Sequence, residues 1–158
     1  MKTMKNIEFQ IPKGYIQDTA KSTPEKLVYK LAKSDNVMER ITCFEDALAE
    51  TGAVSPNMQI LLDYNGIEED LLAAQALVKL TIIAMVLNEG WKPNWSNQNE
   101  YKYYPWFKYD GSAFVFGGVV CDSYGASTAG ASRLCFKSKE LAEYAGRTFI
   151  NKYKNLIL

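Results

Sequence analysis

The segment between residues 67 and 89 constrains the fold most strongly. Three acidic residues, 68–70, occupy its first turn, where the helix dipole favours negative charge. After Lys79 the sequence "LTIIAMVL" is apolar on nearly every side, and Asn88-Glu89-Gly90 with Pro93 beyond it marks the end. A helix that is apolar all round is covered on all sides in a folded domain. We therefore expect a long buried central helix at about 67–89, with the rest of the chain packed around it.

A membrane span is the alternative interpretation of this segment. The stretch from Leu71 to Leu87 is 17 residues long and contains Gln75, Lys79 and Thr81. A bilayer crossing needs about 20 largely apolar residues. The first residues, "MKTMKNIEFQIPKG", also lack the apolar core of a signal peptide. We expect a cytoplasmic protein with no membrane partner.

A β-hairpin is predicted further along the chain. "KYYPWFKYD" and "SAFVFGGVVCDS" flank Asp110-Gly111, a strong two-residue turn signal. Pro105 cannot donate a ladder hydrogen bond, which places it on an edge strand or at a bulge. Residues 133–136 predict a short strand, and 124–132 a loop. Residues 139–156 predict one amphipathic helix, capped by Ser138 and carrying a Glu143–Arg147 pair.

The front of the chain carries weaker signals. "EKLVYKLA" (25–32) alternates as a half-buried strand does, although a short helix with Thr23 as N-cap is the rival interpretation. Residues 7–11 predict a strand. Residues 42–52 predict a helix, with Thr42 and Glu45 at capping-box spacing. The fold class expected is α+β in a single domain, 1–158, with a front module of about 1–55 and a helix-hairpin-helix core of about 56–158.

The amino-acid composition excludes several kinds of catalytic and metal-binding site. The chain contains no histidine, which removes Ser-His-Asp and Cys-His catalysis and histidine metal ligation. Cys43, Cys121 and Cys135 are too far apart for a zinc ligand pair. The sequence contains neither the Walker motif GxxxxGK(S/T) nor the dinucleotide-binding motif GxGxxG, which are the two glycine-rich motifs that bind phosphates. We expect no catalytic, cofactor or metal site. The 18 basic and 18 acidic residues cancel, so no bulk charge attracts phosphate backbones.

The block "YKYYPWFKYD" (101–110) supplies the candidate binding surface, since six of its ten residues are aromatic. In a strand, Tyr103, Pro105 and Phe107 share one face, which we expect to cover the central helix. Aromatic and lysine side chains alternate on the other face. The candidate surface comprises Trp95, Lys102, Tyr104, Trp106, Lys108 and Arg133. Alternatively, Tyr104 and Trp106 pack under a neighbouring loop while the lysines remain solvated.

Two stretches carry a resemblance to a known group. "IPKGYIQDTAKSTPEKLVYK" (11–30) resembles the front module of an uncharacterised family of Bacteroidetes and phage or prophage proteins. "LVKLTIIAMVLNEGWKPNW", "YKYYPWF" and "SRLCFKSKELAEYAG" are similar to the back signature of the same group. The resemblance implies a bacterial cytoplasmic setting and a mobile-element origin. It implies no activity.

The function these features favour is a small non-enzymatic interaction module that binds a protein partner or a second copy of itself. A nucleic-acid accessory protein is the alternative, in which the aromatic and lysine face binds single strands. A second alternative is an atypical hydrolase that uses carboxylates near the hairpin, such as Asp110, Asp122, Glu140 and Glu143.

Overall fold

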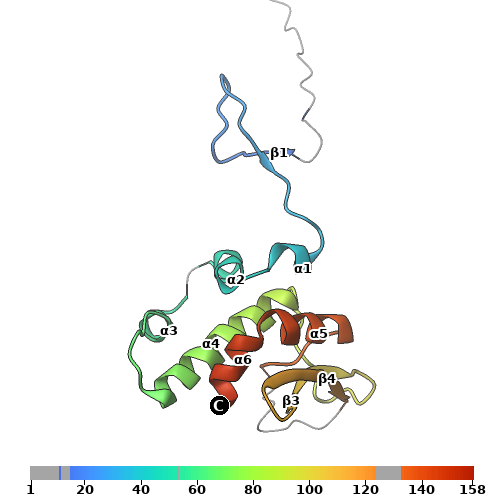
Figure 1. Cartoon of the computed structure of the whole chain (residues 1–158). Coiled ribbons are helices and arrows are strands. Elements are labelled where there is room, and N and C mark those ends of the chain that lie inside the picture. Colours follow the sequence, from blue (N-terminus) through green and yellow to red (C-terminus); the bar gives the residue numbers. More distant parts are fainter. Residues whose placement is uncertain (1–10, 12–14, 53, 124–132) are drawn as a thin grey trace, which may run out of the picture. The chain divides into compact units, whose positions relative to one another are not determined.

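The computed structural model describes residues 11, 15–52, 54–123 and 133–158 (Figure 1). Chain contacts divide the protein into two compact units, Met1–Asp35 and Asn36–Leu158. The division falls after Asp35, so the helices that follow Asp35 belong to the larger unit. The expected strand at 7–11 lies outside the described residues except for Ile11, which is in no strand.

The small unit is a two-stranded antiparallel hairpin. Strand β1 (Tyr15–Gln17) pairs with β2 (Tyr29–Leu31), and Ile16 lies opposite Lys30. The strand expected at 25–32 is therefore confirmed over 29–31. Thr23 accepts hydrogen bonds from the backbone of Glu25 and Lys26 within a turn. Residues 24–31 form no helix, so the rival interpretation of this segment is wrong.

The larger unit, in its described part, begins with three short helices and one long helix. These are α1 (Val37–Arg40), α2 (Phe44–Thr51), α3 (Pro56–Leu62) and α4 (Glu69–Leu87). The cap of α2 differs from expectation by one residue. Asp46, not Glu45, reaches back to accept from the backbone of Thr42 (2.9 Å) and Cys43 (3.1 Å). Helix α2 starts one residue later than Thr42 would place it, so the acidic side chain three positions on is Asp46.

Helix α4 is the central element, as predicted. Leu80, Ile83 and Leu87 are completely or almost completely buried, and α2, α3 and α6 pack against α4 (Figure 1). By length and composition α4 is able to cross a membrane, but the core helix of a soluble protein meets the same description. Its enclosure is incomplete. Leu71, Leu77 and Met85 are 42%, 39% and 50% exposed. The prediction that other elements would cover α4 on every side is therefore wrong for the side that carries these three residues.

The hairpin forms with a longer turn than expected. Strand β3 (Lys102–Tyr109) pairs antiparallel with β4 (Phe114–Asp122), and residues 110–113 connect them. A side-chain oxygen of Asp110 accepts from the backbone N–H groups of Ser112 and Ala113, which holds the turn. The strand edge at Pro105 is confirmed, because β3 and β4 form a sheet of two strands. The register shift falls between Trp106 and Phe107.

The C-terminal helix is interrupted. Helix α5 (Lys139–Thr148) and helix α6 (Ile150–Ile157) meet at Phe149, whose ψ of 23° departs from helical geometry. The break gives the two helices different partners: α5 packs on the hairpin and α6 packs on α4 (Figure 1). The predicted Ser138 cap is confirmed at 3.3 Å from Leu141 N, as is the Glu143–Arg147 ion pair at 2.9 Å.

One hydrophobic core joins these elements. The inner face of the hairpin meets the C-terminal helices most closely: the Phe107 ring lies 4.7 Å from that of Tyr153, centroid to centroid. The predicted strand at 133–136 is reduced to one residue, Phe136, which exchanges two backbone hydrogen bonds with Tyr103. The buried Asn88 side chain donates to Cys135 O (2.8 Å) and accepts from Lys137 N (2.9 Å), joining the end of α4 to this segment.

Candidate functional site

The structure separates the six residues of the predicted binding surface. Trp106 and Lys108 project from the outer face of the hairpin, and Trp106 is 58% exposed. The absence of a side chain at Gly117 in β4 explains why a large ring fits here. Gly118 lies opposite Trp106 with a φ of +150°, which favours glycine, and a Cβ on Gly117 would come within 3.3 Å of the Trp106 ring. The ring therefore lies beside Gly117, while Gly118 is needed for its backbone conformation.

Tyr104 occupies the same face but is half-buried. Its hydroxyl group is buried and has no hydrogen-bond partner among the residues that the structure describes. Burial raises the pKa of this phenol to about 12, so it stays protonated at physiological pH. Val120, its cross-strand neighbour, is exposed and adds an apolar side chain beside Trp106.

Lys102 does not belong to the surface. Its side chain is fully buried, and its ammonium group donates to the carbonyl oxygens of Asn94 (2.7 Å), Glu100 (2.7 Å) and Ser123 (2.9 Å). A fourth carbonyl, of Asn97, lies at 3.3 Å. The loop 94–100 folds over the lysine, which strand alternation alone had placed in solvent. The prediction of Lys102 as a ligand-binding residue is therefore wrong.

Trp95 and Arg133 also lie outside the hairpin face. The ammonium of Lys102 lies 5.2 Å from the Trp95 ring centroid, so Trp95 forms part of the same closed loop. Arg133 is exposed on the segment that leads from the hairpin to α5. The structure thus pairs Trp95 with Lys102 in one place and Trp106 with Lys108 in another.

Three groups in the hairpin half of the chain, Asp110, Glu140 and Cys135, have environments that disfavour acid–base or nucleophilic catalysis. Hydrogen bonds from Ala113 and Ser112 lower the pKa of Asp110 to about 2, and the pKa of Glu140 is lowered by backbone and Ser138 contacts. Both stay ionised at neutral pH and cannot serve as general acids. Burial raises the pKa of Cys135 to about 11, which suppresses its thiolate. Among the described residues no group of acidic or cysteine side chains is arranged to hold a metal ion.

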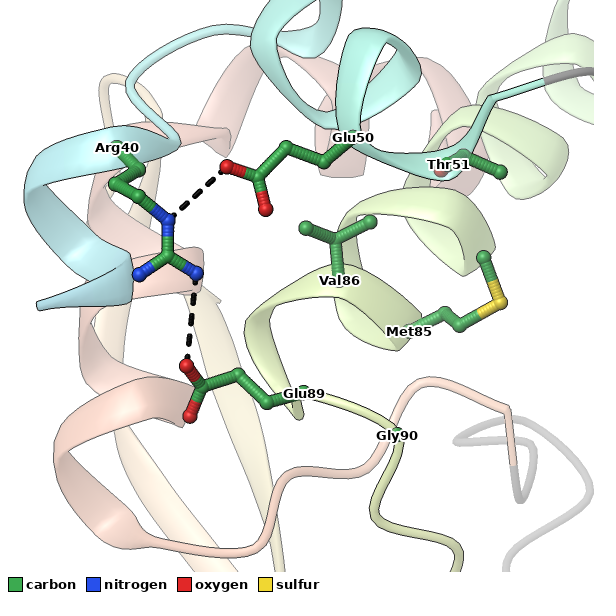
Figure 2. Close-up of a pocket in the computed structure, with 7 residues that line it drawn as sticks. All are labelled: Arg40, Glu50, Thr51, Met85, Val86, Glu89 and Gly90. Atoms are coloured by element: carbon green, nitrogen blue, oxygen red, sulfur yellow. Dashed lines mark hydrogen bonds and ion pairs between the residues drawn. The ribbon is translucent and has the colours of Figure 1, made fainter. Parts of the chain in front are cut away.

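A pocket that the sequence did not suggest lies where α1, α2 and the end of α4 meet (Figure 2). It has a volume of about 390 Å³ and is lined by Arg40, Glu50, Thr51, Met85, Val86, Glu89 and Gly90. Arg40 Nε lies 3.0 Å from Glu50, and Arg40 Nη2 lies 3.5 Å from Glu89. Figure 2 shows the arginine between the two carboxylates, with Val86 and Met85 forming an apolar side.

The electrostatics of this pocket suit binding better than proton transfer. Lys137 donates to Glu89 at 3.0 Å, and this hydrogen bond is the main cause that lowers the pKa of Glu89. Hydrogen bonding to Glu50 raises the pKa of Arg40. The pocket therefore holds fixed, paired charges at neutral pH. No local signal in the sequence connects Arg40 with Glu89. These residues are far apart in the chain and meet only because α1 lies beside the end of α4 in the folded protein.

Comparisons with protein-family models, with curated proteins and with solved structures find no match to this chain.

Proposed function

We propose that the chain is a small non-enzymatic interaction module that binds another protein molecule through the outer face of the hairpin. This hairpin face consists of Tyr104, Trp106, Lys108, Gly118 and Val120. The observation that carries the proposal is the exposure of the Trp106 ring on a two-stranded sheet that packs against α5. The bound molecule is a second copy of the chain or a different protein.

Several properties of the hairpin face support protein binding. Tryptophan is the residue type most enriched at the energetic centres of protein interfaces, and Val120 extends the apolar surface beside it. Gly117 places no side chain against the Trp106 ring, which leaves the exposed ring open to a partner. In the described part of the chain, no strand pairs with the far edge of β4, which leaves its backbone groups available to a partner strand.

The nucleic-acid alternative receives less support from the same surface. Stacking on Trp106 suits a base as well as a protein side chain. However, the burial of Lys102 leaves Lys108 as the lysine of this face in β3, and the chain has no net charge to attract phosphates. We retain the bacterial cytoplasmic setting and the mobile-element origin as part of the proposal, on the sequence resemblance described above.

The test compares the full-length chain with Trp106→Ala and with Ile157→Ala, which removes an exposed apolar side chain at the other end of the larger unit's sequence. Light scattering over a range of concentrations measures self-association, and a pull-down compares the proteins captured by each variant. We expect association or capture to be lost with Trp106→Ala alone. A strictly monomeric wild type that captures the same proteins as Trp106→Ala would contradict the proposal. Trp fluorescence quenching by a single-stranded oligonucleotide at low salt, absent in Trp106→Ala, would assign the surface to nucleic acid.

A further inference from the structure

A second exposed apolar surface lies on α4, in a different part of the molecule from the hairpin face. Five residues spaced three or four apart along the helix form this α4 stripe: Leu71, Ala74, Leu77, Thr81 and Met85. The hydroxyl group of Thr81 donates to Leu77 O at 2.8 Å, so its polar atom is already satisfied by the helix. From residue 71 to residue 85 the stripe is about 21 Å long, the length of about four helical turns.

The opposite sides of α4 are fixed, so the stripe is a preformed surface. The amide nitrogen of Gln75 donates to the carbonyl oxygens of Leu61, Leu62 and Tyr64, which lie at the end of α3 and just beyond it. Lys79, the one basic residue of α4, donates to the Gln75 side chain at 2.7 Å and lies over the ring of Phe44 in α2. Its positive charge therefore faces α2 and the Gln75 amide, and the stripe itself carries no basic residue.

Negative charge borders the start of the stripe. Between Arg40 and Lys79 the sequence contains no lysine or arginine, but it contains seven acidic residues: Glu45, Asp46, Glu50, Asp63, Glu68, Glu69 and Asp70. The last three are exposed at the start of α4, beside Leu71. At the other end Met85 also lines the pocket that contains Glu50 and Glu89 (Figure 2). In that pocket Arg40 and Lys137 pair with Glu50 and Glu89, so the net negative charge beside the stripe lies at residues 68–70.

We infer that the α4 stripe docks a basic amphipathic helix of a partner protein. Apolar side chains at every third or fourth position of the partner would lie along Leu71, Leu77 and Met85, as in other helix-in-groove complexes. Its lysines or arginines would face residues 68–70 at the start of α4. The charges of residues 68–70 disfavour two other occupants: a second copy placed parallel on the stripe would bring these carboxylates together, and an anionic membrane would be repelled.

The experiment uses the full-length chain and a fluorescently labelled synthetic peptide of leucine and lysine, with leucines at helical spacing. Two control peptides accompany it: one with the same composition in scrambled order, and one with glutamate in place of lysine. We expect the leucine–lysine peptide to bind about tenfold or more tightly than the scrambled peptide, measured by fluorescence anisotropy. The leucine–glutamate peptide should not bind.

Variants then locate the binding. Leu77→Ser combined with Met85→Ser should weaken binding about tenfold or more, because both side chains lose apolar contact. Glu68→Gln with Asp70→Asn should weaken binding and reduce its salt dependence. Val120→Ser on the hairpin should have no effect, which separates this inference from the proposed function. Circular dichroism checks that the variants remain folded.

Three results would overturn the inference: no binding of the leucine–lysine peptide, equal binding of the leucine–glutamate peptide, or unchanged binding to the stripe double variant. Concentration-dependent light scattering that Leu77→Ser abolishes would assign the stripe to a second copy instead. Binding of zwitterionic phosphatidylcholine vesicles that Leu77→Ser abolishes would assign it to a lipid surface. Either of these assignments also contradicts a helical protein partner.

Discussion

The ammonium group of Lys102 donates a 2.9 Å hydrogen bond to the carbonyl oxygen of Ser123, the residue that follows the last residue of the neighbouring strand. The same group donates to the carbonyl oxygens of Asn94 and Glu100, and lies 3.3 Å from the Glu100 carboxylate. One buried cation therefore fixes both the loop that enters β3 and the residue that leaves β4. Lys102 therefore stabilises the strands that form the hairpin face, although its own side chain is not exposed on that face.

Lys102→Met should destabilise the fold strongly. The methionine fills part of the space but leaves the carbonyl oxygens of Asn94, Glu100 and Ser123 without their donor, in a site that water enters poorly. Buried polar groups left unsatisfied cost about 1–3 kcal/mol each, with partial relief by rearrangement, so we expect a loss of about 2–4 kcal/mol. The measurement is the free energy of unfolding from urea denaturation.

Lys108→Met is the matched control for this prediction, because Lys108 lies on the same strand and is exposed. Its unfolding free energy should change by less than about 0.5 kcal/mol. Equal effects of the two substitutions would show that the carbonyl contacts of Lys102 do not stabilise the fold.

Asn88→Ala should detach the end of α4 from the segment before α5. The substitution removes a donor to Cys135 O and an acceptor for Lys137 N, both in the interior or at its margin. We expect a loss of about 2–3 kcal/mol, seen as a lower midpoint of thermal unfolding. Asn155→Ala, at an exposed position of α6, provides the comparison. An Asn88→Ala protein that melts with the Asn155→Ala protein would contradict the role of this bridge.

The stability of the protein should fall in acid partly through Asp46. Hydrogen bonds from Thr42 and Cys43 lower the pKa of this carboxyl to about 2, against about 3.9 in an unfolded chain. Because the folded-state pKa is the lower one, the ionised carboxylate stabilises the fold above about pH 4, and this contribution disappears as the pH falls towards 2. Urea denaturation at a series of pH values should therefore show a smaller acid loss in Asp46→Asn than in the wild type. Parallel pH curves for the two proteins would rule out this role.

The sequence predicted those features that depend on local pattern. The continuous apolar run of α4, the hairpin around residue 110 and the Glu143–Arg147 pair all follow from residues that are neighbours along the chain. In each case the side chains that decide the structure lie within one or two turns, or on two strands joined by a short connection. Their formation needs little information from the rest of the molecule.

Features that depend on distant packing were missed or placed wrongly. Alternation along β3 assigned Lys102 to the outer face, but it could not show that the loop 94–100 closes over that end of the face. The stripe of Leu141, Ala145 and Tyr153 continues across Phe149, so the periodicity did not reveal the break between α5 and α6. The pocket depends on a contact between Arg40 and Glu89 that no spacing rule predicts.

Gly146→Ala tests the packing of α5 on the hairpin. In a solvent-exposed helix this change stabilises by about 1 kcal/mol. Here a Cβ at position 146 would lie 2.6 Å from Phe116 Cε2 and 2.8 Å from Pro105 Cβ, so one of the two elements must move. We expect a net loss of about 1–2 kcal/mol in the unfolding free energy, measured by urea denaturation.

Thr148→Ala, at an exposed position of the same helix, should be neutral or stabilising. Phe116→Val should reduce the cost of Gly146→Ala in the double variant, since it removes the ring that the new methyl group meets. Additive effects of the two substitutions would show that α5 and the hairpin do not meet at this point.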